Sequence, residues 1–199
     1  MTTQRIAILG GTFDPPHNGH LALACGVADA LSLDRVLLIP TGNPHFKLDQ
    51  KVTSVEDRVA MTQLLAAEDQ RLEVSRIEAD RPGVTYTVDT LHALQEQNPD
   101  AELLFIIGGD CAEHIMKWRN ADLLARQCTV VAVGRAGYDF AAARKAIDAC
   151  GLGFKVEYFT FDVPDVSSTG IRAAAAAGED ITSMVPSSVA AYIAEHQLY

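Results

Sequence analysis

Two histidines, His17 and His20, are the residues whose types and spacing point most directly to chemistry. They follow a glycine pair, Gly10 and Gly11, and lead into the helix-forming run 21–24. A glycine turn that opens a helix presents backbone N–H groups and a helix N-terminus, which together favour anions. Residues three positions apart share a helix face, so both imidazoles are expected to face the same bound group. The segment therefore predicts a phosphate site that performs chemistry as well as binding.

Other readings of this segment fit less well. The chain has no G-x-x-x-x-G-K-[ST] loop and no G-x-G-x-x-G after its first apolar run. The second apolar run leads into Pro40 and lacks the carboxylate that a dinucleotide site uses for ribose hydroxyls. A histidine metal pair would need further ligands, and the cysteines show no ligand-like spacing. They are predicted to be reduced core residues: Cys25, Cys111, Cys128 and Cys150. Helix capping by the two histidines alone remains a further alternative.

The elements that must position these residues alternate between strand-like and helical patterns. Strands are predicted near 5–9, 35–39, 72–76, 103–107, 128–133 and 155–160. Helices are predicted near 19–31, 54–67, 88–97, 119–126, 138–150, 168–177 and 187–196. This alternation predicts an α/β, Rossmann-like, doubly wound parallel sheet, with one domain over 1–199 and two C-terminal helices. Ligands of such sheets bind at the carboxyl ends of the strands, where the unusual residues of this chain gather.

Composition and charge narrow the class of partner. The chain has 199 residues, 48% of them hydrophobic and 21% charged, which is ordinary for a globular enzyme. Its net charge of −10 argues against nucleic acid and against an anionic membrane, since both select basic surfaces. No signal-like or membrane-spanning run is visible, so a cytoplasmic protein is expected. Oligomeric state is not predicted by these features.

The stretch 10–20, G-G-T-F-D-P-P-H-N-G-H, resembles the nucleotidyltransferase superfamily marked by H-x-G-H. Its full form looks most like the bacterial nicotinate-mononucleotide adenylyltransferases. The segment 166–172, V-S-S-T-G-I-R, resembles the superfamily's I-S-S-T-x-I-R signature, and Ser168 is expected to cap the helix that it opens. The loop 40–47 keeps a lysine, Lys47, at the family's distance from Pro40, although His45 and Phe46 replace the family's proline and histidine.

Three weaker marks follow the same family in order. Arg58 matches an R-x-x-M pattern, but by itself it would be a surface helix residue. The stretch 85–91, T-Y-T-V-D-T-L, is similar to S-Y-T-x-D-T-L, and Thr87 is a possible helix cap. Asp110 and Trp118 match the I-G-x-D and K-W marks, and Asp110 is expected to end a buried strand. The resemblance spans nearly the whole chain.

The resemblance implies transfer of an adenylyl group from ATP to nicotinate mononucleotide, with Mg²⁺ accompanying ATP and no metal cage in the protein. Catalytic roles are expected for His17, His20, Arg172 and Lys47. Contacts to ATP are expected from Gly10, Gly11, Thr12, Phe13, Asp110, Ser168 and Thr169. Contacts to the acceptor are expected from Thr85, Tyr86, Thr87, Trp118 and Arg135.

Two alternatives stay open. Other H-x-G-H enzymes use nicotinamide mononucleotide or phosphopantetheine as the acceptor. A non-catalytic nucleotide sensor could keep the same pocket, although sensing would not require His17, His20 and Arg172 together. Release of pyrophosphate from ATP separates an enzyme from a sensor.

Overall fold

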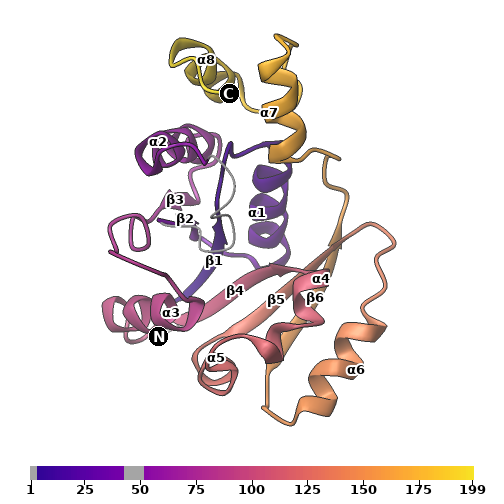
Figure 1. The fold of residues 1–199 in the computed structure, drawn as a ribbon. Helices are drawn as coiled ribbons and strands as arrows, with labels where there is room; N and C mark the ends of the chain where they lie inside the picture. Colours follow the sequence, from indigo (N-terminus) through magenta and orange to yellow (C-terminus); the bar gives the residue numbers. More distant parts are fainter. Residues whose placement is uncertain (1–3, 43–51) are drawn as a thin grey trace.

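The computed structural model describes residues 4–42 and 52–199, in which six parallel strands form one sheet. Their order across the sheet is β3-β2-β1-β4-β5-β6 (Figure 1). The strands are β1 (Arg5–Gly11), β2 (Val36–Pro40), β3 (Leu72–Val74), β4 (Glu102–Gly108), β5 (Thr129–Arg135) and β6 (Lys155–Phe161). All six predicted strands are present, and the α/β doubly wound prediction is confirmed.

Helices follow the strands in the predicted alternation. They are α1 (Asn18–Leu31), α2 (Val55–Ala66), α3 (Thr87–Gln97), α5 (Ala121–Gln127), α6 (Ala141–Cys150), α7 (Ser168–Ala176) and α8 (Ser187–Glu195). Two short elements were not predicted: α4 (Gly109–Ala112) and the 3-10 turn η2 (Ile115–Lys117). They are a single turn each, too short for a hydrophobic period to reveal them.

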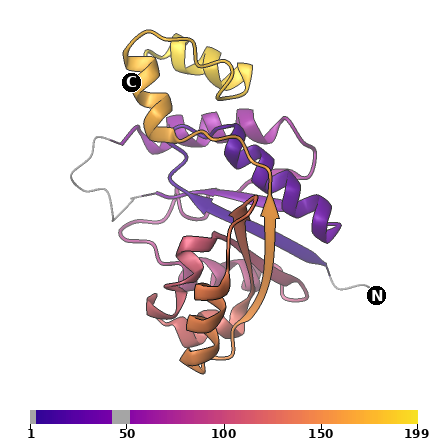
Figure 2. The ribbon, with the colours of Figure 1, turned by 90° about the vertical axis from the view of Figure 1, so that its right-hand side faces the viewer.

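Successive strand residues point to opposite faces of the sheet and so build two cores. Ala7 and Leu9 of β1 pack in one core with residues of α1, α2, α7 and α8. Ile6 and Ile8 pack in the other core, with residues of α3, α5 and α6. Figures 1 and 2 show α7 and α8 at one end of the molecule, on the side of α1 and α2. Strands buried on both faces explain the continuous apolar runs in the sequence.

The centre of the sheet is the point where its winding direction reverses. β1 pairs with β2 on one side and with β4 on the other, all in parallel. The chain leaves β1 toward β2 and later returns to β4 on the far side, so the connections diverge above the end of β1. Ligands of open α/β sheets bind in the crevice at such a point. The glycine and histidine motif lies there.

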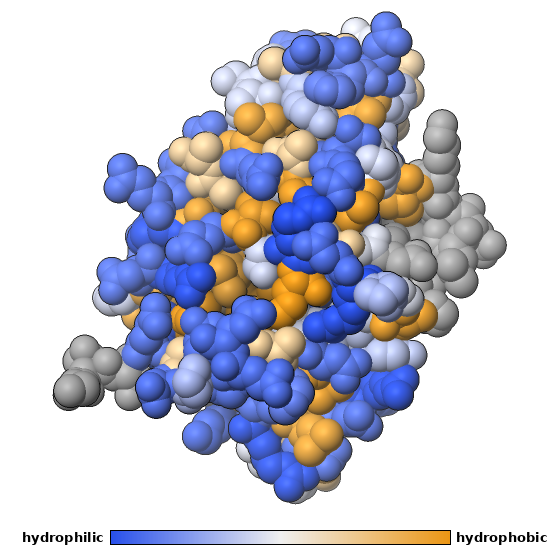
Figure 3. Space-filling model, turned by 90° about the vertical axis from the view of Figure 1, so that its left-hand side faces the viewer, coloured by the Kyte–Doolittle hydropathy of each residue, from blue (hydrophilic) through white to orange (hydrophobic). Residues whose placement is uncertain are grey.

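The edge of the sheet and the molecular surface are polar. Glu73 of edge strand β3 forms an ion pair with Arg35, and charge on an edge strand discourages pairing with other chains. Hydrophilic residues cover most of the face seen in Figure 3, with hydrophobic residues in small groups between them. Within the described residues, no helix is long and apolar enough to cross a membrane. Cys128 is buried, but Cys111 is exposed, so the prediction of a core position is wrong for Cys111.

Candidate active site

The loop between β1 and α1 carries the two histidines to the centre of the sheet. It contains a cis peptide bond between Asp14 and Pro15, and Phe13 has a left-handed φ of 50° with its ring buried. His17 is the N-cap residue of α1, and His20 is the third residue of that helix. The loop ends in the helix start that the sequence predicted.

The histidines cap the helix and each other with one nitrogen of each ring. The Nδ1 atom of His17 accepts the backbone N–H of His20 at 3.3 Å, and Nδ1 of His20 accepts the N–H of His17 at 3.2 Å. A nitrogen that accepts a backbone N–H carries no proton, so the proton of each neutral ring is on Nε2. Among the described residues neither Nε2 has a hydrogen-bond partner. Capping and donation are therefore compatible, because they use opposite sides of each ring.

Burial keeps both rings neutral at physiological pH. It lowers the pKa of His17 to about 4, and a backbone hydrogen bond opposes part of this shift. Burial also lowers the pKa of His20 to about 3, with a further contribution from the nearby His17. The ring centroids lie 3.7 Å apart with an angle of 26° between the planes, which disfavours two positive charges. The pair is built to present two neutral N–H donors.

Two glycines make room around this pair. A Cβ at Gly19 would lie 3.0 Å from Nδ1 of His17 and 3.3 Å from Val166, so a side chain at position 19 would press on the His17 ring. A Cβ at Gly10 would meet no described atom within 4 Å. Gly10 is exposed although it belongs to the central strand. Among the described residues, nothing fills the space beside the Gly10 backbone, where a ligand could approach.

We call residues 12–17, which connect β1 to α1, the motif loop. Its backbone carbonyls accept hydrogen bonds from side chains of distant elements. Arg58 of α2 donates to the carbonyl of Thr12 at 2.7 Å, and Arg172 of α7 donates to that of Asp14 at 2.8 Å. Ser168 donates to the carbonyl of Pro15 at 2.9 Å. These contacts fix the path of the loop.

Arg58 differs most from its predicted position. It is only 1% exposed, where the sequence suggested a surface residue. Its guanidinium also donates to the carbonyls of Thr53 at 3.1 Å and Gly42 at 3.0 Å, which connects α2 to the end of β2. The helical spacing shared with Met61 and Leu65, both fully buried, could have revealed this position.

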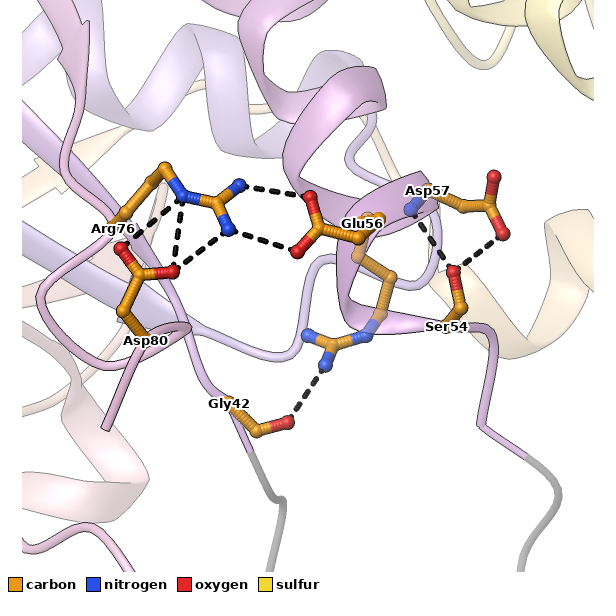
Figure 4. A network of polar contacts seen from close by, with 7 residues as sticks. Gly42, Ser54, Glu56, Asp57, Arg76 and Asp80 are labelled. Carbon is orange, nitrogen blue, oxygen red and sulfur yellow. Dashed lines mark hydrogen bonds and ion pairs between the residues drawn. The ribbon is translucent and has the colours of Figure 1, made fainter. Parts of the chain in front are cut away.

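The start of α2 is itself fixed by polar contacts. Figure 4 shows the hydroxyl of Ser54 accepting the backbone N–H of Asp57, which caps α2. It also shows Arg76 between Glu56 and Asp80. The Arg76 ion pairs have N–O distances of 2.8 Å to Glu56 and 2.7 Å to Asp80. Both pairs are solvent-exposed, so their contribution to stability is small.

The helix α7 starts beside the motif, as expected, but its cap is different. Ser167 is the N-cap residue and accepts the N–H of Gly170 at 3.1 Å, so the prediction of Ser168 as the cap is wrong. Ser168 is the first helical residue, which frees its hydroxyl to bind the loop. Arg172 also contacts the hydroxyl of Thr169 at 3.4 Å. The guanidinium therefore lies between the start of α7 and the motif loop.

A pocket of about 470 Å³ lies near the start of α3, and four of the expected acceptor residues line it. Its lining consists of Thr85, Tyr86, Thr87, Lys117, Trp118, Arg119 and Leu124. Tyr86, and not Thr87 as predicted, is the N-cap residue of α3, and among the described residues its side chain makes no capping hydrogen bond. Thr85 Oγ1 is buried without a hydrogen-bond partner among the described residues.

Two cations, Lys117 and Arg119, also line this pocket. The guanidinium of Arg119 lies 4.2 Å from the centre of the Tyr86 ring, and Lys117 lies beside Trp118 in the lining. A helix start, an unpartnered hydroxyl and two cations favour an anionic group. The flat Trp118 ring supplies a surface for an aromatic ligand.

Two further expected site residues, Asp110 and Arg135, do not line this pocket. Asp110 is exposed in α4 and does not end the buried strand; a Cβ at Gly108 would lie 2.6 Å from its carboxylate. Arg135 ends β5, is exposed, and forms an ion pair with Asp165, outside the lining of the acceptor pocket. Lys47 lies outside the described residues. Over residues 4–42 and 52–199, no group of three or more His, Cys, Asp or Glu side chains is arranged to hold a metal ion.

Comparison with known proteins agrees with the fold and with the motifs. The cytidylyltransferase-like family model matches residues 8–174. A probable nicotinate-nucleotide adenylyltransferase of Corynebacterium kroppenstedtii is 46% identical over 98% of this chain and 90% of its own length. One from Symbiobacterium thermophilum is 42% identical, over 98% and 95% of the two lengths.

A solved structure supports the architecture. The nicotinic acid mononucleotide adenylyltransferase of Plasmodium falciparum, complexed with NaAD, superposes with a TM-score of 0.80 at 18% identity. The superposition covers 98% of this chain and 97% of that one. At this identity the likeness concerns the fold, whereas the closer sequence relatives establish the family. The chain belongs to the cytidylyltransferase-like family and, within it, to the nicotinate-nucleotide adenylyltransferases.

Proposed function

We propose that this chain transfers the adenylyl group of ATP to nicotinate mononucleotide, which yields nicotinate adenine dinucleotide and pyrophosphate in NAD biosynthesis. An oxygen of the acceptor's 5′-phosphate attacks the α-phosphorus of ATP. The bond from that phosphorus to the bridging oxygen of the β-phosphate breaks, and pyrophosphate leaves with the electron pair. The attacking phosphate is ionised near neutral pH, so the reaction needs positioning and charge stabilisation and does not need a general base.

The observation that carries this proposal is the pair of neutral histidines whose Nε2–H groups have no hydrogen-bond partner in residues 4–42 and 52–199. Negative charge builds on the oxygens around the α-phosphorus during attack, and fixed donors stabilise it best. His17 and His20 would supply these donors.

The rest of the ATP site follows from the elements beside that pair. The backbone of Gly10, Gly11, Thr12 and Phe13 would border the nucleotide, and the exposed carboxylate of Asp110 would accept ribose hydroxyls. The start of α7, with Ser168 and Thr169, would hold the β- and γ-phosphates. Arg172 would bind the same phosphates, and Lys47 is proposed to counter their charge.

Mg²⁺ is proposed to enter with ATP as part of the substrate. Mg²⁺ keeps several waters and is commonly bound by one or two carboxylates plus substrate phosphates. The only carboxylate inside the motif is that of Asp14, which already accepts hydrogen bonds from Tyr199 and Thr53. This donor set fits an ion that the triphosphate carries. The ion would neutralise phosphate charge.

For the acceptor, we propose that the pocket beside α3 holds the nicotinate ring and its carboxylate. Trp118 would stack on the ring. The carboxylate would accept hydrogen bonds from Thr85 Oγ1 and from N–H groups of the α3 start, around Tyr86 and Thr87. Arg135 remains a predicted acceptor contact that this pocket does not explain.

Pyrophosphate release from ATP tests the proposal, with nicotinate mononucleotide, nicotinamide mononucleotide and phosphopantetheine as acceptors. The expected result is Mg²⁺-dependent release that is at least about tenfold more efficient in kcat/KM with nicotinate mononucleotide than with its amide. Release that is unchanged in EDTA, or faster with CTP, would contradict ATP as the donor. Equal efficiency with both pyridine nucleotides would make the enzyme dual-specific.

The proposal also covers organisation and location. One domain over residues 1–199 would carry both substrate sites, because the histidine pair and the acceptor pocket both belong to the single sheet and its helices. Both substrates are cytoplasmic metabolites, so the enzyme is proposed to act in the cytoplasm.

A further inference from the structure

Asp14 is the only carboxylate between Gly10 and His20, and it is 2% exposed. A buried carboxylate is costly unless hydrogen bonds satisfy it. One oxygen, Oδ1, accepts the hydroxyl of Tyr199 at 2.7 Å, and the other, Oδ2, accepts the N–H of Thr53 at 3.4 Å. The shorter bond comes from the residue farthest away in sequence.

Tyr199 reaches this position by way of α8. The backbone N–H of Leu198 donates to the carbonyl of Ile193 at 3.1 Å, which turns the chain back after the helix. Figure 1 shows the end of the chain between α7 and α8. Burial raises the pKa of the Tyr199 phenol well above its usual value; a hydrogen bond with Thr53 opposes part of this shift, and the hydrogen bond to Asp14 adds to it. The phenol therefore stays protonated and donates.

The contact with Asp14 couples Tyr199 to both halves of the proposed phosphate site. The backbone carbonyl of Asp14 is the acceptor for Arg172, at 2.8 Å. His17 follows Asp14 by three residues, through Pro15 and Pro16, whose rings restrict the backbone. A shift of Asp14 would therefore move both a phosphate-binding guanidinium and a donor imidazole.

We infer that Tyr199 is a positioning residue for adenylyl transfer, which acts by fixing the Asp14 carboxylate inside the motif loop. The inference rests on the proposed function for its kinetic consequence. Tyr199 would touch neither substrate, so its removal should alter kcat through geometry and leave acceptor binding unchanged. Small displacements of reacting groups cost as much as 100-fold in rate.

The chain supplies a matched control in Tyr192 of α8. Its hydroxyl donates to Oδ1 of Asp57 at 2.9 Å, so it too joins the end of the chain to an aspartate. Asp57 is half-buried in the first turn of α2 and does not belong to the motif loop. Tyr199→Phe and Tyr192→Phe each remove one hydroxyl and one tyrosine–aspartate hydrogen bond.

The experiment compares both variants by thermal unfolding and by steady-state kinetics with ATP and nicotinate mononucleotide. With similar Tm values, Tyr199→Phe is expected to lower kcat about tenfold with acceptor KM within twofold, while Tyr192→Phe stays within twofold of the parent. Equal losses of kcat in both variants, or no loss in either, would overturn the inference.

A second variant tests whether the effect passes through the carboxylate. Asp14→Asn should lower kcat, and adding Tyr199→Phe to it should change kcat less than twofold, since coupled residues are not additive. Multiplicative losses in the double variant would overturn the route through Asp14.

Histidine ¹⁵N–¹H spectra of the substrate-free protein separate this inference from the proposed function. Tyr199→Phe should shift the His17 side-chain signals, whereas Tyr192→Phe should leave them in place. If the parent protein releases no pyrophosphate, the proposed function fails, while the spectra still test the coupling. Unchanged His17 signals in Tyr199→Phe would overturn the inference by themselves.

Discussion

The motif loop and the acceptor pocket satisfy their polar groups to different degrees. In the loop, donors from α2 and α7 cover the carbonyls of Thr12, Asp14 and Pro15. Beside α3, Thr85 Oγ1 has no hydrogen-bond partner among the described residues, and Tyr86 gives α3 no side-chain cap there. A phosphoryl-transfer centre requires donors held in fixed positions before substrate arrives. A recognition site can leave donors open, because an unpaired buried group penalises the wrong ligand.

The sharpest test of the motif loop, where donors are held in fixed positions, is His20→Ala. Loss of one preorganised donor to developing charge costs on the order of 100-fold in kcat, with both KM values changed much less. Steady-state kinetics measure this, and His92→Ala is the control, since His92 is an exposed residue of α3 paired with Glu96. A near-normal kcat in His20→Ala would mean that His17 and His20 only cap the helix, and the motif loop would then not be a catalytic centre with fixed donors. His17→Ala should behave like His20→Ala.

Arg172→Lys tests whether the contact to Asp14 and the proposed phosphate contact need a guanidinium. A lysine ammonium is a point charge and cannot form the forked contact to phosphate that a planar guanidinium makes. We expect kcat/KM for ATP to fall about 30-fold, on the order of 2 kcal/mol, with acceptor KM unchanged. Arg126→Lys, at an exposed ion pair with Asp122, is the control. A change confined to acceptor KM would move Arg172 to the other substrate.

Thr85→Val tests the acceptor pocket beside α3. It removes the unpartnered hydroxyl while keeping the β-branched shape, so kcat/KM for nicotinate mononucleotide should fall about tenfold, within the 1–3 kcal/mol range of an unpaired buried group. The preference over the amide should narrow, and ATP kinetics should stay unchanged. Ser188→Ala is the matched control, because Ser188 Oγ is also buried and unpartnered among the described residues but belongs to α8. Equal effects on both acceptors would place the carboxylate elsewhere.

The lowered pKa values also predict a small effect on stability. The pKa of His17 is about 4 in the folded protein, against 6.5 for an ordinary histidine. The unfolded chain therefore binds the proton first, and this residue's contribution to stability is present above pH 6.5 and lost as pH falls toward 4. Between pH 6.5 and 5.5 the parent should lose about 1 kcal/mol more than His17→Ala. Urea unfolding at the two pH values measures this, and equal losses would contradict neutral burial.

The sequence was sufficient for the fold, because the fold depends on periodicity. Alternating apolar runs and helical patterns identify βαβ units, and parallel strands bring their carboxyl ends to one edge. That reasoning placed His17 and His20 at the end of β1 without any structure. It could not decide which of two adjacent polar residues is the N-cap of a helix. The N-cap is Ser167 where Ser168 was predicted, and Tyr86 where Thr87 was predicted.

Long-range polar contacts were the part that the sequence could not supply. Nothing in the sequence near Asp14 indicates that Tyr199, 185 residues away, donates to it. The sequence indicated a surface position for Arg58 because an arginine is rarely fully buried. Its burial is tolerated because its guanidinium donates to carbonyls from three separate segments. The short helix α4, which begins directly after β4, contains Asp110, so this residue does not end the buried strand. Such details depend on tertiary packing, which overrides local preference.

The central claim is that His17 and His20 are neutral donors with the proton on Nε2. A pH titration of the substrate-free protein by histidine side-chain ¹⁵N–¹H spectra tests it most directly. The structure predicts the Nε2–H form for both rings at pH 7, with His17 titrating near pH 4 and His20 near pH 3. His92, which is exposed on α3, provides an internal reference ring outside the site. Protons on Nδ1, or cationic rings between pH 6 and 7, would contradict the account.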